Sequence, residues 1–111
     1  MTDPTLDHPL LTARYFYPYP THFAAPFFVQ GEGFRLGCRY LRISADYPTI
    51  IHFHGNGETV ADYLGDFEES ITALKVNLLL AEYRGYGMSS GEPALVAMLD
   101  DVRLIVAASG V

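Results

Sequence analysis

Apolar and polar positions follow two periods along this chain, and the order in which the periods appear indicates the fold. Between residues 27 and 41, two runs rich in strand-forming residues flank the tripeptide GEG, which predicts a β-hairpin. The second run places one apolar set on a single face, as in a half-buried strand: Phe34, Leu36, Cys38 and Tyr40. We therefore interpret Cys38 as a core residue rather than a reactive thiol.

Two short apolar runs, 49–54 and 76–83, predict strands that are buried on both faces, as in a parallel sheet. A glycine-rich loop and then a helical pattern follow each run. The first helical pattern starts at Thr59, which with Asp62 resembles a capping box, and continues to Leu74.

The second helical pattern starts near Pro93, a residue suited to the first turn of a helix. Its predicted apolar stripe consists of Leu95, Leu99, Val102 and Val106, with Met98 and Ile105 beside it. We expect Asp100, Asp101 and Arg103 to face away from this stripe, into solvent.

The order hairpin, strand, helix, strand, helix predicts an α/β sheet with parallel pairing and right-handed crossovers. Residues 1–26 precede it and carry five of the seven prolines, which disfavours a long helix or a central strand there. We interpret this segment as an N-terminal arm, rich in proline and aromatic residues, that packs on the domain. The alternative is a proline-rich ligand for an aromatic groove.

The composition of the chain excludes several classes of protein and of binding site. A hydrophobic content of 50% with 18% charged residues argues against disorder, and a net charge of −6 argues against a nucleic-acid partner. A single cysteine excludes an internal disulfide and a cysteine-based zinc cluster. No apolar run approaches the ~20 residues of a membrane helix, and the N-terminus lacks the pattern of a signal peptide. We expect a soluble, cytoplasmic protein.

The candidate chemistry lies in the two glycine-rich loops, HGNGE at 54–58 and RGYGMSSG at 84–91, because ligands of open α/β sheets bind beyond the carboxyl ends of the strands. Neither loop contains the lysine of a P-loop, and the first lacks the third glycine of a dinucleotide fingerprint. His52 and His54 share one face, but a metal site needs three or four ligands. We therefore expect neither a cofactor nor a metal, and we favour an oxyanion hole.

The two loops in this order resemble those of the α/β-hydrolase superfamily, and in particular uncharacterised bacterial serine hydrolases with HGNGE and YRGYGxSxG in tandem. The resemblance spans residues 27–111 and implies the N-terminal half of an α/β-hydrolase sheet, ending before the nucleophile elbow. It also implies that the backbone N–H of Asn56, or alternatively of Gly57, is one oxyanion donor. The residues implied to shape the two loops are His54, Gly55, Gly85 and Gly87, with Arg84 bracing one loop against the other.

The string GMSSG matches the GxSxG pattern of a nucleophile elbow and makes Ser89 a candidate nucleophile. An elbow serine, however, lies on a sharp turn directly between a strand and a helix, whereas Ser89 is separated from both. The resemblance implies that this loop is non-catalytic and that the serine, acid and histidine of the triad all follow residue 111. His8 and His22 precede the sheet, where the family places no catalytic base.

We therefore expect a serine hydrolase for carboxylic esters or related acyl bonds of small molecules, inactive as these 111 residues alone. The alternative is a small non-catalytic α/β domain that binds a ligand or a partner. By the resemblance, the strand at 49–54 would lie between the fourth and fifth strands of a complete sheet. Because the fifth is not among these residues, we expect poor solubility or self-association through strand 49–54.

Overall fold

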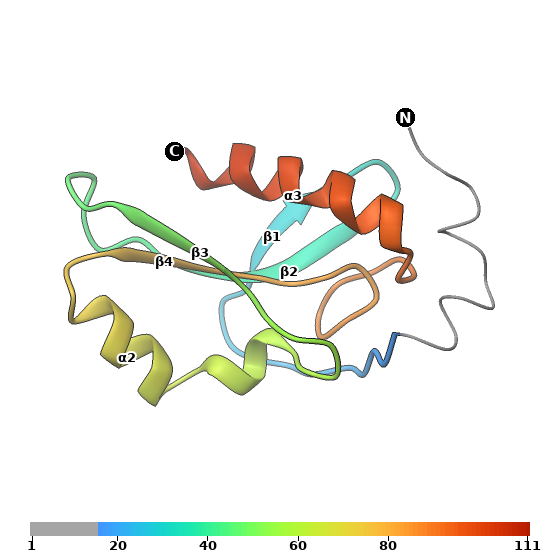
Figure 1. The fold of residues 1–111 in the computed structure, drawn as a ribbon, viewed down its shortest axis with the longest axis horizontal. Coiled ribbons are helices and arrows are strands. Elements are labelled where there is room, and N and C mark those ends of the chain that lie inside the picture. The colour runs from blue at the N-terminus through green and yellow to red at the C-terminus, as the bar shows by residue number, and fades with distance from the viewer. Residues whose placement is uncertain (1–15) are drawn as a thin grey trace.

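The computed structural model describes residues 16–111, so His8 and most of the predicted N-terminal arm lie outside the described residues (Figure 1). Four strands form one sheet in the order β1-β2-β4-β3. The strands are β1 (Phe27–Gln30), β2 (Arg35–Leu41), β3 (Thr49–Phe53) and β4 (Asn77–Ala81). The helices are the 3-10 helix η2 (Val60–Tyr63) and the α-helices α2 (Asp66–Thr72) and α3 (Leu95–Ser109).

The predicted hairpin and the α/β character of the sheet are confirmed. β1 and β2 pair antiparallel with Phe27 opposite Cys38, and β2 also pairs antiparallel with β4. β3 pairs with β4 in parallel, with Ile51 opposite Leu79, and the chain segment that joins these two strands carries η2 and α2. The carboxyl ends of β3 and β4 therefore lie side by side, at one end of the sheet.

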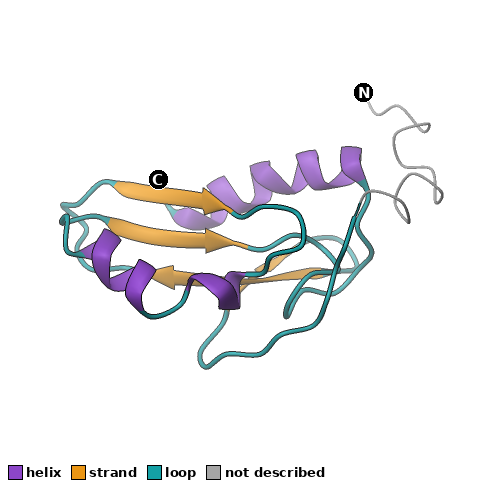
Figure 2. Cartoon of the chain, turned by 60° about the horizontal axis from the view of Figure 1, so that its bottom comes forward, coloured by secondary structure: helices purple, strands orange, loops and turns teal. Residues whose placement is uncertain are grey.

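Helices cover both faces of the sheet, with α3 on one side and α2 with η2 on the other (Figures 1 and 2). β4 serves both cores, because its side chains alternate between the two faces. Leu79 and Ala81 pack with Ile105 of α3, while Leu78 and Leu80 pack with Val60 of η2. The prediction that β4 is buried on both faces is confirmed, and none of its five residues is exposed.

The same prediction was wrong for β3. This strand ends the strand order, so among the described residues it has a hydrogen-bonded neighbour on one side alone. Ile50 is 40% exposed and Phe53 is 37% exposed. An apolar run identifies a buried strand by its composition, but it does not specify how many neighbours the strand has.

The helix predicted from Thr59 is broken in two. Asp62 Oδ2 accepts the Thr59 N–H at 2.8 Å, as the capping-box spacing predicts, but this interaction starts only the four-residue η2. Gly65 then adopts φ 83°, which the right-handed helix excludes, and α2 begins after it. The Glu68 carboxylate accepts the Gly65 N–H at 3.1 Å and so supports the second start.

The predicted orientation of α3 is confirmed in part: Asp100 and Arg103 are exposed and Ile105 is buried, but the stripe and Asp101 were placed wrongly. Leu99 is 62% exposed and Val106 is 43% exposed, whereas Asp101 is 3% exposed. Ile105 faces the sheet as expected, and Leu104 and Ala108, which the predicted stripe left out, pack beside it. Asp101 tolerates burial because Arg84 neutralises it, a contact 17 residues distant in sequence that helical periodicity does not report. Within the described residues, no helix has the length and apolar character needed to cross a membrane.

Candidate functional site

The two glycine-rich loops meet at the carboxyl ends of β3 and β4, as the sequence predicts. Beneath them lies a buried pair that the sequence analysis did not identify. His54 Nε2 is hydrogen-bonded to Oε1 of Glu82, the residue that follows β4, and Glu82 has no exposed surface. The same carboxylate accepts the Val60 N–H at 2.8 Å and the Tyr83 N–H at 3.0 Å. Glu82 thus connects β3, β4 and η2.

The second ring nitrogen of His54 faces the turn that follows it. Nδ1 lies 2.8 Å from the carbonyl oxygen of Gly55. Burial lowers the pKa of His54. The hydrogen bonds to Glu82 and to Gly55 raise it by a larger amount, so the resulting pKa is above the ordinary value of 6.5. His54 therefore contacts Glu82 on one side of its ring and the turn after β3 on the other.

Asn56 is tied to the second loop by its side chain. The hydroxyl of Tyr86 donates to Asn56 Oδ1 at 2.7 Å, and the backbone N–H of Tyr17 donates to the same atom at 3.2 Å. The hydroxyl of Tyr83 donates to the carbonyl oxygen of His54. Two tyrosines from the loop after β4 therefore hold the turn after β3.

Arg84, which the resemblance places as a brace between the loops, contacts α3 and the hairpin. Its guanidinium forms a bidentate ion pair with Asp101 of α3, with N···O distances of 2.7 and 2.5 Å, and lies 4.0 Å above the centre of the Phe34 ring. Arg84 thus braces the second loop against α3 and the hairpin. The expectation that Asp101 is solvated was wrong for the same reason.

Glu58 closes the first loop on itself. Its Oε1 accepts the Gly55 N–H at 2.6 Å and the Tyr63 hydroxyl at 2.7 Å. These hydrogen bonds, that of Tyr63 first, hold the pKa of Glu58 below its usual range. The final letter of HGNGE is the sequence signal that marks this residue, and the sequence analysis gave it no role.

Two glycines of the second loop allow close approach. Gly87 adopts φ 57°, and a Cβ there would lie 2.5 Å from Glu82 Oε2, so any side chain would displace the buried carboxylate. Gly85 adopts φ 80°, and a Cβ there would lie 2.6 Å from Pro93 Cδ. The arm also reaches this loop, since Gly87 N–H donates to the Tyr19 carbonyl at 3.0 Å.

The candidate nucleophile Ser89 has a structural contact. Its Oγ accepts the Gly37 N–H of β2 at 2.9 Å, and the next residue, Ser90, accepts the Arg35 N–H at 2.8 Å through its own Oγ. No hydrogen bond joins Ser89 to a histidine within residues 16–111. The two serines extend the pairing of β2 rather than present a hydroxyl between a strand and a helix.

The other candidate residues lie in packed positions. The His52 ring packs 4.6 Å from that of Tyr63 and 5.2 Å from that of Phe67. The described part of the chain contains no group of three residues able to hold a metal ion. Cys38 is buried in the core, where desolvation raises its pKa to about 12, so its thiol is protonated at neutral pH.

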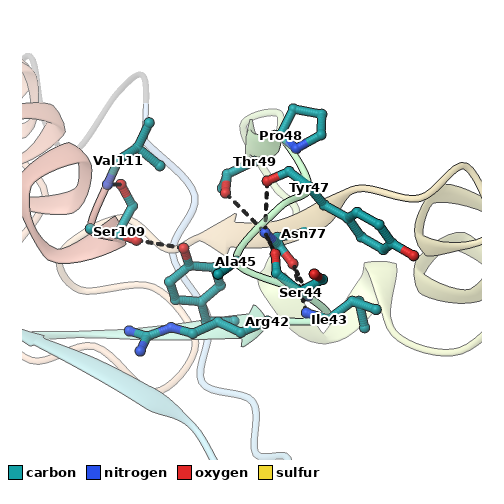
Figure 3. Close-up of a pocket in the computed structure, with 12 residues that line it drawn as sticks. Arg42, Ile43, Ser44, Ala45, Tyr47, Pro48, Thr49, Asn77, Ser109 and Val111 are labelled. Carbon is teal, nitrogen blue, oxygen red and sulfur yellow. Dashed lines mark hydrogen bonds between the residues drawn. The ribbon is translucent and has the colours of Figure 1, made fainter.

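Two cavities flank the sheet at opposite ends. One of about 320 Å³ adjoins Asn56, and apolar or aromatic side chains form most of its wall: Phe16, Phe53, Tyr83, Tyr86, Leu95, Met98, Leu99 and Val102. The other, of about 550 Å³, lies at the amino end of β3 and is built around Asn77 (Figure 3). Asn77 Oδ1 accepts the Ile43 N–H at 2.6 Å, and its Nδ2 donates to the Ser44 carbonyl at 2.8 Å. Asn77 therefore orders the loop before β3.

Comparison with known proteins supports the superfamily. The chain is 31% identical over 76 residues to Alpha/beta hydrolase domain-containing protein WAV2 of Arabidopsis thaliana, an alignment covering 67% of this chain and 25% of that protein. It is 36% identical over 47 residues to Protein bem46 of Schizosaccharomyces pombe, covering 42% of this chain and 16% of that protein. No protein-family profile matches the chain. No solved structure matches it either.

The chain therefore spans a quarter or less of the length of these two relatives. Its four-stranded sheet with two α-helices is consistent with part of an α/β-hydrolase fold.

Proposed function

We propose that residues 16–111 supply the oxyanion loop of an α/β-hydrolase-type serine hydrolase that acts on carboxylic esters or related acyl bonds of small molecules. One observation carries the proposal: the loop at 54–58 lies at the carboxyl end of a parallel strand and is held by contacts from the loop after the neighbouring strand. Those contacts come from Tyr83 and Tyr86. A donor held rigidly before the reaction is what an oxyanion hole requires.

The proposed donor is the backbone N–H of Asn56. Acyl transfer passes through a tetrahedral intermediate whose oxygen carries negative charge, and a positioned N–H stabilises that charge. Gly57 is the alternative donor, since nothing in the described part of the chain accepts a hydrogen bond from its N–H. Gly57 adopts φ 84°, and no atom would obstruct a Cβ there, so its backbone is open on that side.

The proposed hydrolase takes its nucleophile from outside these 111 residues. The Ser89 hydroxyl accepts a hydrogen bond from β2, which suits a structural role. The chain alone should therefore leave an activated ester unhydrolysed and should not react with a serine-directed fluorophosphonate. Labelling that is lost in Ser89→Ala would overturn this part of the proposal.

The oxyanion site itself is tested with methylphosphonate, a soluble tetrahedral anion. In ¹⁵N-labelled chain, the amide resonances of Asn56 or Gly57 should shift on titration, because a backbone N–H that binds an anion is deshielded. The amides of Gly31 and Gly33, in the hairpin turn, are the internal control. Shifts confined to the control glycines, or absent throughout, would contradict the assignment.

The cavity beside Asn56 favours a second candidate function, a non-catalytic domain that binds an apolar ligand. Its wall is formed mostly by apolar and aromatic side chains, as in many small-molecule sites. An apolar fluorescent probe distinguishes the two functions. Binding that persists in Asn56→Pro, together with no response to methylphosphonate, would favour the binding domain.

A further inference from the structure

We infer that His54 is held as an imidazolium by Glu82 and orients the Asn56 N–H, so that the oxyanion donor responds to pH. In naming Asn56 as the donor, this inference rests on the proposed function. The charge state of His54 and its coupling to the turn stand on the geometry alone.

The first step is a count of donors and acceptors around the His54 ring. Nδ1 faces the Gly55 carbonyl oxygen, which accepts but never donates. Nε2 faces Glu82, whose two oxygens already accept backbone N–H groups from Tyr83 and Val60. A carboxylate that accepts from two N–H groups is favoured as the anion. Both ring nitrogens therefore need a proton, which only the imidazolium supplies.

The second step links that ring to the proposed donor. The Gly55 carbonyl and the Asn56 N–H belong to one peptide unit, which is planar and trans, so the two groups point in opposite directions. Fixing the oxygen therefore fixes the direction of the N–H. Nδ1 of His54 holds the oxygen at 2.8 Å, and the Glu58 N–H holds it from the other side of the turn at 3.2 Å.

The surroundings favour the charged ring. Carboxylates act on His54 from each polar element nearby: Glu82 after β4, Glu58 in its own loop, and Asp62 on η2. The aromatic rings of Tyr83 and Tyr86 pack against it at 4.4 and 5.8 Å. The guanidinium of Arg84, in the loop after β4, is paired with Asp101. These carboxylates explain why the pKa of His54 is raised despite burial.

The consequence of raising the pH follows from the same count. A neutral imidazole has one N–H and one lone pair, yet two acceptors face the ring. One hydrogen bond must therefore be lost, and either the Gly55 carbonyl is released or Glu82 is left facing a lone pair. The folded-state pKa of His54 lies above 6.5. The contribution of the charged ring to the stability of the fold is therefore complete below pH 6.5, and it is lost as the pH rises through the folded-state pKa.

Nuclear magnetic resonance of the 111-residue chain tests this inference without any activity. Long-range ¹H–¹⁵N correlations report how many protons each ring nitrogen carries. We expect two protons on His54 at pH 6.5, and amide shifts of Asn56 that titrate with the same midpoint as the ring. A neutral His54 ring at pH 6.5, or an Asn56 amide that ignores the titration, would overturn the inference.

Two variants sharpen the test. Glu82→Gln should convert His54 to the neutral ring at pH 6.5 and uncouple the Asn56 amide from pH. His52→Phe is the matched control, because His52 lies two residues away on β3. Within the described residues its ring packs against Tyr63 and Phe67, and its Nε2 makes no hydrogen bond. The control should leave the His54 titration unchanged; loss of the His54 coupling in this variant would contradict the role of Glu82.

If Glu82→Gln does not fold, the titration of the wild-type chain still decides the question. Failure of the methylphosphonate titration with an intact His54–Asn56 coupling would reject only the proposed function.

Discussion

The hydroxyl of Tyr86 donates to Asn56 Oδ1 across 30 residues of sequence, at 2.7 Å. The ring of Tyr86 is buried, so this hydroxyl emerges from the core at the point where the two loops meet. Tyr86 also accepts the Tyr17 N–H at 3.2 Å, which brings the arm to the same place. A buried aromatic residue with a polar tip thus joins three segments of the chain.

Tyr86→Phe should destabilise the chain by about 2 kcal/mol, because the ring remains packed but both hydrogen bonds of the hydroxyl are lost. The free energy of unfolding from urea titration measures the effect. Tyr47→Phe is the control, since the Tyr47 hydroxyl makes no hydrogen bond within the described part of the chain. Equal losses in the two variants would show that the Tyr86 hydroxyl contributes nothing specific.

Asn56→Pro should reduce activity far more than Asn56→Ala in a complete hydrolase that carries residues 16–111. Proline deletes the backbone N–H, and loss of one oxyanion donor costs ~10²–10³ in turnover. Alanine keeps the N–H but removes the acceptor of Tyr86, so a smaller loss is expected from a less rigid turn. Equal turnover numbers for the two variants would remove Asn56 from the oxyanion site.

Arg84→Met should destabilise the chain by about 3 kcal/mol, because it leaves the buried Asp101 carboxylate without its cation. The double variant with Asp101→Leu should recover part of this loss, since a buried ion pair is often replaceable by apolar residues. Asp100→Asn is the control, because Asp100 precedes Asp101 in the sequence but is exposed, so its loss of charge should change the free energy of unfolding little. A neutral effect of Arg84→Met would contradict the bracing role.

The sequence predicted what depends on local pattern and missed what depends on distant partners. The hairpin, the fully buried β4 and the glycine loops at one end of the sheet all follow from short-range periodicity. The face of α3 does not, because Arg84 draws Asp101 inward. Glu82 has one sequence signal, an acid at the end of an apolar strand beside a glycine loop. Its partner, 28 residues earlier, becomes visible only in the fold.

The exposed edge of β3 gives the last prediction, which concerns self-association. Edge strands are normally short, charged, bulged or covered. β3 is short, but no charged residue lies within Thr49–Phe53, and no other described strand pairs with its outer edge. We propose that the 111-residue chain associates through this strand, and that Ile50→Lys shifts it toward the monomer. Ile50 is 40% exposed, so a lysine fits there without entering the core.

Size-exclusion chromatography with light scattering measures the association, and hydrogen exchange across residues 49–53 locates it. Ile43→Lys is the matched control. This substitution adds the same charge, but Ile43, which is 54% exposed, lies in the loop before β3. Since both variants change the net charge equally, only a contact at the strand edge makes them differ. A wild-type monomer with strong protection across β3 would contradict the prediction, and would favour the self-contained binding domain over the hydrolase segment.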